Sequence, residues 1–172
     1  AQVVGVYDAR TKSVNLDINA DRVSAAYSTG YLGLGRSIRV HGGTLRVAAG
    51  VRVRRVGGRS RMAAAGVIGV SNGSASLSIF REPVKGINGN IALADQRLIL
   101  SLNGSLAGSG AQVAGEISGF TNPKLDLVVT SPDVDFSRLL QVANLPASVR
   151  QLQPRGRGPA RAVVTGSAAA PV

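Results

Sequence analysis

Few residues in this sequence have the types and spacing that catalysis requires. Asp133 and Asp135 lie two positions apart and could act as a carboxylate pair in acid–base chemistry. Both also precede an amphipathic stretch, where an aspartate commonly caps a helix. The single histidine, His41, stands just before a glycine pair, and the chain has no cysteine. We interpret His41 as a surface residue at a turn, and we predict that the protein is not an enzyme.

The glycine-rich segments and the acidic residues do not indicate a cofactor or metal site. Residues 33–35 and 108–110 do not open predicted helices, so they are not interpreted as phosphate-binding loops. The 9 acidic residues are scattered, mostly at polar strand positions or beside turns. No group of them suggests a metal site. We therefore expect neither a cofactor nor a metal.

The chain is strongly basic, with 20 Lys and Arg against 9 Asp and Glu and a net charge of +11. No acidic residue lies between Asp21 and Glu82. Such a surface attracts polyanions, including anionic lipid headgroups; the alternative is a compositional bias on a solvated face. Nucleic-acid binding is disfavoured, because stacking aromatic residues do not interleave with the arginines of residues 36–61.

Alternation of apolar and polar residues is the strongest signal of structure. It runs through residues 14–20, 45–54, 98–103, 113–117 and 125–129. Because successive side chains of a strand point to opposite faces, these runs predict strands with one apolar and one largely polar face. The polar side chains predicted to point to water are Arg46, Arg52, Arg54, Glu116 and Asp126.

Residues that favour tight turns separate these runs, which predicts an all-β antiparallel meander of roughly ten to twelve strands. Short gaps between the runs favour hairpins. The predicted breaks are Gly42-Gly43, Gly57-Gly58, Asn72-Gly73, Asn88-Gly89, Asn103-Gly104, residues 108–110 and residues 119–123.

One stretch has the period of a helix instead. Phe136, Leu139 and Leu140 are spaced i, i+3, i+4, with Asp133 or Asp135 as the cap. We predict one short helix near residues 133–143, whose apolar stripe caps an end of the sheet.

The sequence also contains an internal echo. Residues 12–23 resemble residues 123–134, with Leu16 matching Leu127 at an offset of 127 − 16 = 111. We interpret residues 1–172 as a single segment of a longer repetitive protein, with approximate repeat units 1–111 and 112–172, the second one partial.

Several of these motifs occur in a fixed order. A small-residue strand at 91–94 precedes Asp95, an L-x-L-x-L strand at 98–102 and a G-S-x-x-x-V-x-G run at 108–115. A P-x-L-D-L-x-V strand at 123–129 and a D-V-D-F-x-x-L-L helix at 133–140 follow. Over residues 87–166 this order resembles the AsmA-like and TamB families of bacterial envelope proteins.

The resemblance implies an elongated, taco-like β-groove with an apolar lining, in a periplasmic protein that a segment not present here anchors to the inner membrane. It also implies phospholipid traffic between inner and outer membrane and a role in outer-membrane biogenesis. The partners it implies are phospholipid acyl chains, anionic lipid headgroups and an outer-membrane β-barrel of the assembly type.

The residues alone leave two architectures open. The apolar face either lines an open groove or forms the core of a closed β-sandwich, barrel or solenoid, as in a structural or adhesin segment. The groove hypothesis assigns the lipid-binding face to Val14, Leu16, Ile18, Leu45, Val47, Val51, Val53, Leu77, Ile79, Leu98, Leu100, Leu102, Val113, Ile117, Leu125, Leu127 and Val129.

Overall fold

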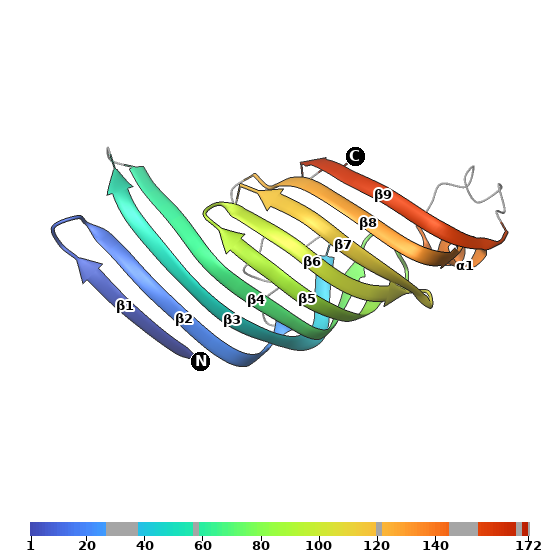
Figure 1. Ribbon diagram of the computed structural model, residues 1–172, viewed down its shortest axis with the longest axis horizontal. Helices are drawn as coiled ribbons and strands as arrows, with labels where there is room; N and C mark the ends of the chain where they lie inside the picture. Colours follow the sequence, from blue (N-terminus) through green and yellow to red (C-terminus); the bar gives the residue numbers. More distant parts are fainter. Residues whose placement is uncertain (27–37, 57–58, 120–121, 145–154, 168–169, 172) are drawn as a thin grey trace.

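The computed structural model describes residues 1–26, 38–56, 59–119, 122–144, 155–167 and 170–171. They form one antiparallel sheet whose strands follow one another in chain order, as Figure 1 shows. The predicted all-β meander with one short helix is therefore confirmed. The strands are β1 (Gln2–Asp8), β2 (Ser13–Ser24), β3 (Ile38–Val56), β4 (Arg59–Leu77), β5 (Val84–Ala94), β6 (Arg97–Leu106), β7 (Ser109–Ser118), β8 (Lys124–Asp135), β9 (Arg157–Ser167) and the two-residue β10 (Ala170–Pro171).

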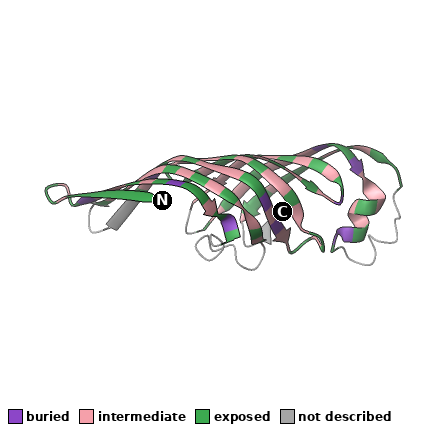
Figure 2. Ribbon diagram, turned by 90° about the horizontal axis from the view of Figure 1, so that it is seen from below, coloured by how far each residue is buried: buried purple, intermediate pink, exposed green. Residues whose placement is uncertain are grey.

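The sheet is open, and it arches. Strand order runs from β1 at one end to β10 at the other, and these two ends are not paired. Viewed along its edge, the sheet curves over a hollow, with α1 (Phe136–Val142) on the concave side (Figure 2). A closed sandwich, barrel or solenoid is therefore wrong for the described residues, and the open twisted sheet is right.

The molecule has almost no conventional core. Its accessible surface is 11504 Å², whereas a compact protein of 17.6 kDa is expected to expose about 7,900 Å². Among the described residues, no large side chain is fully buried. Most of the buried apolar residues of the described chain are alanines, so backbone ladders and one-sided side-chain contacts hold this sheet together. The buried apolar residues are Ala20, Ala25, Ala64, Ala75, Ala107, Val134, Val142 and Ala143.

Four predicted turns lie inside strands instead. Gly42-Gly43 falls within β3, Asn72-Gly73 within β4, Asn88-Gly89 within β5 and Asn103-Gly104 within β6. The first three lie at or beside shifts of the strand register. Glycine and asparagine tolerate the backbone of a bulge as readily as that of a turn, so their presence alone did not distinguish the two.

Gly43 shows why glycine is needed within a strand. Its φ is +116°, and a Cβ built on it would lie 2.6 Å from the Cα of Gly73 in β4. The glycines therefore permit a close approach of two strands that continue past this point. The break predicted at 108–110 lies one residue earlier: Ala107 and Gly108 take positive φ values between β6 and β7, and Ser109 and Gly110 already belong to β7. The break at 119–123 also falls between strands, and Gly57-Gly58 lies outside the described residues.

The predicted helix is confirmed, and its cap is Asp135. The Asp135 carboxylate accepts hydrogen bonds from the Arg138 backbone N–H at 3.1 Å and from the Ser137 hydroxyl at 2.6 Å. Asp133 instead forms an ion pair with Arg157 of β9, at 2.6 Å. Of the two candidate aspartates, one therefore starts the helix and the other joins β8 to β9.

The chain after α1 is joined to the chain after β4. The Arg81 backbone N–H donates to the Val142 carbonyl at 2.7 Å, and the Asn144 N–H donates to the Ile79 carbonyl at 2.8 Å. Phe80 and Ala143 form an isolated antiparallel bridge between these bonds. This link passes over the intervening strands β5 to β8, so α1 is tied to the sheet at both of its ends.

Candidate functional site

The strand register places aliphatic residues in continuous rows across the sheet. Side chains of directly opposed residues on neighbouring strands lie on the same face. Starting from Leu100 of β6, each partner in turn is aliphatic or glycine. This middle row runs Ala20, Val47, Ile68, Ile91, Leu100, Gly115, Leu127, Val164, from β2 to β9.

Two further rows flank the middle row on the same face. They lie two residues away along each strand, or three where the register of β2 shifts between Ala20 and Val23, and contain neither a charged nor a polar side chain. One runs Val3, Ile18, Ala49, Gly66, Leu93, Leu98, Ile117, Leu125, Gly166, and the other runs Val23, Leu45, Val70, Gly89, Leu102, Val113, Val129, Ala162. We call the three rows together the apolar rows.

Most of the predicted lining residues lie in or beside the apolar rows. Val14 pairs with Val53, and Leu16 pairs with Val51, directly beside the row that contains Ile18. The eleven predicted residues within the rows are Ile18, Leu45, Val47, Leu98, Leu100, Leu102, Val113, Ile117, Leu125, Leu127 and Val129.

Two predicted lining residues are placed elsewhere. Leu77 pairs with Ile38 beyond the register shifts of β3 and β4, at the far end of these strands. Ile79 lies past the end of β4, is 60% exposed, and its carbonyl accepts the Asn144 N–H. In the sequence, apolar and polar residues still alternate from Leu77 to Ile79. The strand β4, however, ends at Leu77, so Ile79 is not on the sheet face.

Sequence reasoning missed several members of the apolar rows. Ile68 and Val70 belong to β4, whose stretch 62–70 is nearly all small or apolar and shows no alternation. Ile91, Leu93 and Val164 were passed over for the same reason. An unbroken apolar run does not reveal which residues share a face. The register with β3 and β5 supplies that information.

The apolar rows lie on the concave side of the arch. Residues 158, 160, 162 and 164 of β9 alternate regularly, so Gly158 faces the same side as Val164. A Cβ on Gly158 would lie 3.8 Å from Cε2 of Phe136, and α1 is on the concave side in Figure 2. The apolar rows therefore share the concave side with α1.

Little of the described chain covers the apolar rows. Ala20 is their one buried member, and nearly all the others are half-buried, because their neighbours in the sheet shield only part of each side chain. A continuous exposed apolar surface across nine strands is unusual, since soluble monomers rarely expose a large patch unless it binds something. The arrangement is suited to a long, flexible apolar ligand.

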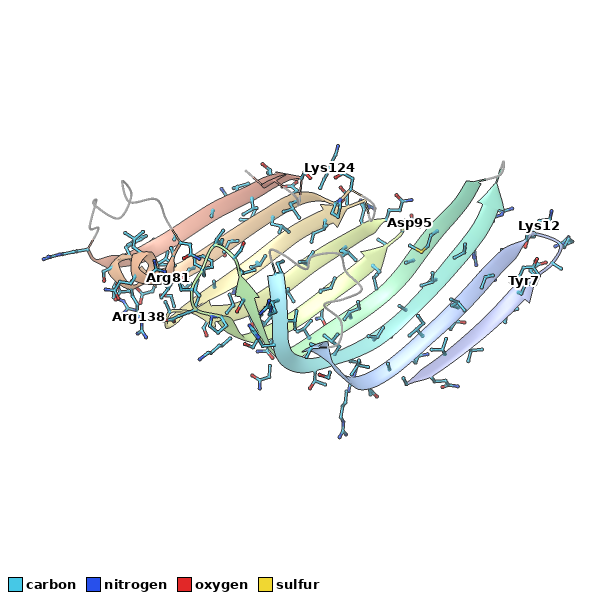
Figure 3. All side chains as sticks on the ribbon, turned by 180° about the vertical axis from the view of Figure 1, so that it is seen from behind. Tyr7, Lys12, Arg81, Asp95, Lys124 and Arg138 are labelled. Atoms are coloured by element: carbon cyan, nitrogen blue, oxygen red, sulfur yellow. The ribbon has the colours of Figure 1, made fainter. Side chains whose placement is uncertain are left out.

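The charged side chains that the structure describes in the central strands lie on the convex face and along the rims. Arg46 and Arg52 of β3 are exposed and bind Asp21 at 2.7 Å and Asn15 at 2.8 Å, and Arg54 is also exposed. Their predicted outward orientation is confirmed. Lys12, Asp95 and Lys124 follow one rim, whereas Arg81 and Arg138 lie toward the other (Figure 3).

The convex face is less polar than predicted. Val67 is 46% exposed, Ile99 is 45% exposed and Val163 is 50% exposed. They occupy positions between the apolar rows, so they point away from the concave side. Unlike the concave residues, Ile99 is paired with the charged Glu116. Charged side chains therefore break up the apolar surface of the convex face.

The candidate reactive residues take structural positions. The ion pair with Arg157 lowers the pKa of Asp133, and the hydrogen bonds from Ser137 and the Arg138 N–H lower that of Asp135. His41 lies within β3 rather than at a turn, is exposed, and has its Nε2 2.6 Å from the Ser76 hydroxyl. Within the described part of the chain, no cluster of three or more His, Asp or Glu could hold a metal ion.

No helix of the described residues is long and apolar enough to span a bilayer. No family model matches this sequence, and neither a curated protein nor a solved structure matches it.

Proposed function

We propose that the concave face holds phospholipid acyl chains, in a segment of a bacterial envelope-spanning β-groove protein that conducts phospholipid between inner and outer membrane. Such a protein supports outer-membrane biogenesis. The observation that carries the proposal is the continuity of the apolar rows on the concave side of an open sheet. The partners and location implied by the resemblance to AsmA-like and TamB proteins belong to the same proposal.

The dimensions of the face suit acyl chains. Nine strands spaced about 4.8 Å apart give a surface of roughly 38 Å along the rows, and three rows two residues apart give a width of about 14 Å. The hydrocarbon core of a bilayer is about 30 Å thick for two opposed chains. The face can therefore take at least two acyl chains end to end.

The chemistry of the face also favours lipid over a ligand with defined polar groups. Every position of the apolar rows is Val, Leu, Ile, Ala or Gly, so the face offers side-chain contacts without side-chain hydrogen bonds. Burial of each acyl CH₂ contributes about 0.8 kcal/mol. A surface of this kind binds many acyl chains without distinguishing among them, as lipid traffic requires.

Anionic headgroups would remain outside the apolar rows. The exposed arginines of β3 carry positive charge on the convex face, and Lys12 and Lys124 carry it along one rim. Such exposed charges attract anionic lipid weakly, because salt screens them within roughly 8 Å at physiological ionic strength.

Photocrosslinking in cells tests the proposal. A photoreactive residue at Leu100 projects into the middle row, whereas one at the neighbouring Ser101 projects from the convex face. We expect labelled phospholipid at position 100 and none at position 101. Capture of a protein at position 100, with no lipid, would show that another chain covers the concave face and would refute the proposal.

A further inference from the structure

β1 forms a free edge of the sheet and is unusually apolar for such a position. It pairs only with β2 among the described strands. Its side chains are exposed on both faces, with Val3 at 61%, Val6 at 60% and Tyr7 at 65%. Natural edge strands are usually protected by lysine, proline, bulges or inward charge. β1 has no lysine, arginine or proline, and its pairing with β2 is regular.

β9, near the opposite end, illustrates such protection. It contains Arg157, Pro159 and Arg161, and β10 pairs with its last residues. Proline cannot donate to a ladder, and charges disfavour the pairing of another strand. The contrast indicates that β1 is built to be paired.

The β1–β2 hairpin duplicates the β7–β8 hairpin in sequence. Residues 1–5, Ala-Gln-Val-Val-Gly, correspond to residues 111–115, Ala-Gln-Val-Ala-Gly. The pairings coincide as well, because Gly5 is opposite Leu16 in the first hairpin and Gly115 is opposite Leu127 in the second. This match extends the echo between residues 12–23 and 123–134 to the strand that precedes each of them.

The duplication includes an irregularity of the register. The pairing of β2 with β3 shifts between Ala20 and Val23, and the pairing of β8 with β9 shifts between Ser131 and Val134. The two shifts lie 111 residues apart at both of their limits, since 131 − 20 = 111 and 134 − 23 = 111. A bulge is a specific feature of a strand pair, so the shared position of these shifts extends the duplication from sequence to strand register.

In the second hairpin, the edge that corresponds to the free edge of β1 is occupied. β6 pairs there with β7, so that Leu98 is opposite Ile117, Leu100 is opposite Gly115 and Leu102 is opposite Val113. The corresponding residues of β1 are Tyr7, Gly5 and Val3. Gly115 has no side chain opposite Leu100, and Gly5 leaves the same position open on β1.

We propose that the free edge of β1 binds an antiparallel strand of the β6 type, with large aliphatic residues at three alternate positions opposite Tyr7, Gly5 and Val3. Backbone hydrogen bonds supply the affinity, and the alternating aliphatic residues fix the register. The added strand extends the apolar row that contains Val3, and it adds an aliphatic residue beside Gly5 and Tyr7, which pair with Leu16 and Val14 on the same face. This inference rests on the strand pairings and does not depend on whether the concave face binds lipid.

An engineered disulfide tests the predicted register. A second copy of residues 84–110 is joined ahead of Ala1 of the full chain, with Ser101→Cys in the copy and Val4→Cys in β1. Ser101 pairs with Ala114 in β7, and Ala114 corresponds to Val4, so the two cysteines should lie opposite each other. Opposed Cα atoms are roughly 4.5–5.5 Å apart, within disulfide range. The chain has no other cysteine.

Matched controls distinguish the predicted register from random contact. Ile99→Cys in the copy with Val6→Cys should also form a disulfide, because Ile99 pairs with Glu116 and Glu116 corresponds to Val6. Ile99→Cys with Val4→Cys should not, because diagonal Cα atoms are about 8 Å apart. A copy with Leu98, Leu100 and Leu102 all replaced by Ser should lose the matched disulfides, although its linker is unchanged.

Three results would overturn the proposal. Equal disulfide yields from matched and mismatched pairs would show that the copy is not docked in register. Retention of the matched disulfides in the triple-serine copy would show that the aliphatic residues are not recognised. Disulfide-linked dimers through Val4→Cys that persist in the extended chain would show that a second β1, and not a β6-type strand, occupies the edge.

Discussion

The two faces of the sheet differ by a single step along each strand, yet they have opposite character. The middle row of the concave side contains Leu100 between Ile91 and Gly115. One residue earlier, Ile99 of the convex side lies between Ala92 and Glu116, and Glu116 is followed by Asp126. Both faces contain exposed aliphatic residues, but only the concave face contains them without interruption. Continuity, and not the mere presence of apolar residues, is what marks a binding surface.

The largest effect is expected from placing a charge on each face in turn. Leu100→Arg should lower the binding of a fluorescent fatty acid about tenfold or more, because arginine in a hydrocarbon environment costs about 3 kcal/mol. Ser101→Arg should leave binding unchanged. Circular dichroism should show that both variants keep the sheet, since an open face lets the arginine reach solvent. If Leu100→Arg unfolds the chain, the concave face is a closed core.

A second test changes the glycines. A Cβ on Gly115, which has φ +142°, would clash with the Asp126 carbonyl oxygen and lie 2.8 Å from the Cα of Leu127. Gly115→Ala should therefore destabilise the sheet by about 2 kcal/mol or more. Gly110→Ala meets nothing within 4 Å and should be nearly neutral. Urea unfolding measures both, and equal effects would contradict the close approach at Gly115.

Removing positive charge from the convex face is expected to have a smaller effect on lipid binding. Replacing Arg46, Arg52 and Arg54 by Gln should weaken binding to vesicles that contain anionic lipid, by about 1 kcal/mol per arginine near the surface. Binding of the original chain should fall steeply as salt is raised. Co-sedimentation measures this, with neutral vesicles as the control. Equal binding to anionic and neutral vesicles would show that these arginines do not contribute to lipid binding.

The smallest effect is expected when the pH is lowered and the stability of the fold is measured. The pKa values of Asp133 and Asp135 are lowered in the folded protein from their ordinary value of 3.8. Both carboxylates therefore stabilise the fold above about that pH, and the stabilisation is lost as the pH falls through their folded pKa values. The melting temperature should decline below about pH 4. Asp133→Asn combined with Asp135→Asn should reduce this decline, and an unchanged decline would exclude the two carboxylates as its cause.

Much of the fold follows from local sequence. Alternation in β2, β6, β7 and β8 identified these strands and their apolar side, because a strand has a side-chain period of two. The spacing of Phe136, Leu139 and Leu140 identified the helix. Alternation failed in β4, where small residues conceal the period. Gly42-Gly43 within β3 and Asn72-Gly73 within β4 resembled turns, because a bulge and a turn require the same backbone freedom.

In the alternating strands, the sequence by itself determined which residues share a face, but it did not determine what lies against that face. A closed sandwich and an open groove require the same alternation along each strand. The difference depends on curvature and on the pairing of the outermost strands, which are long-range properties of the whole sheet. Only the tertiary structure shows that β1 and β10 stay apart and that most side chains of the apolar rows are no more than half-buried on the concave side.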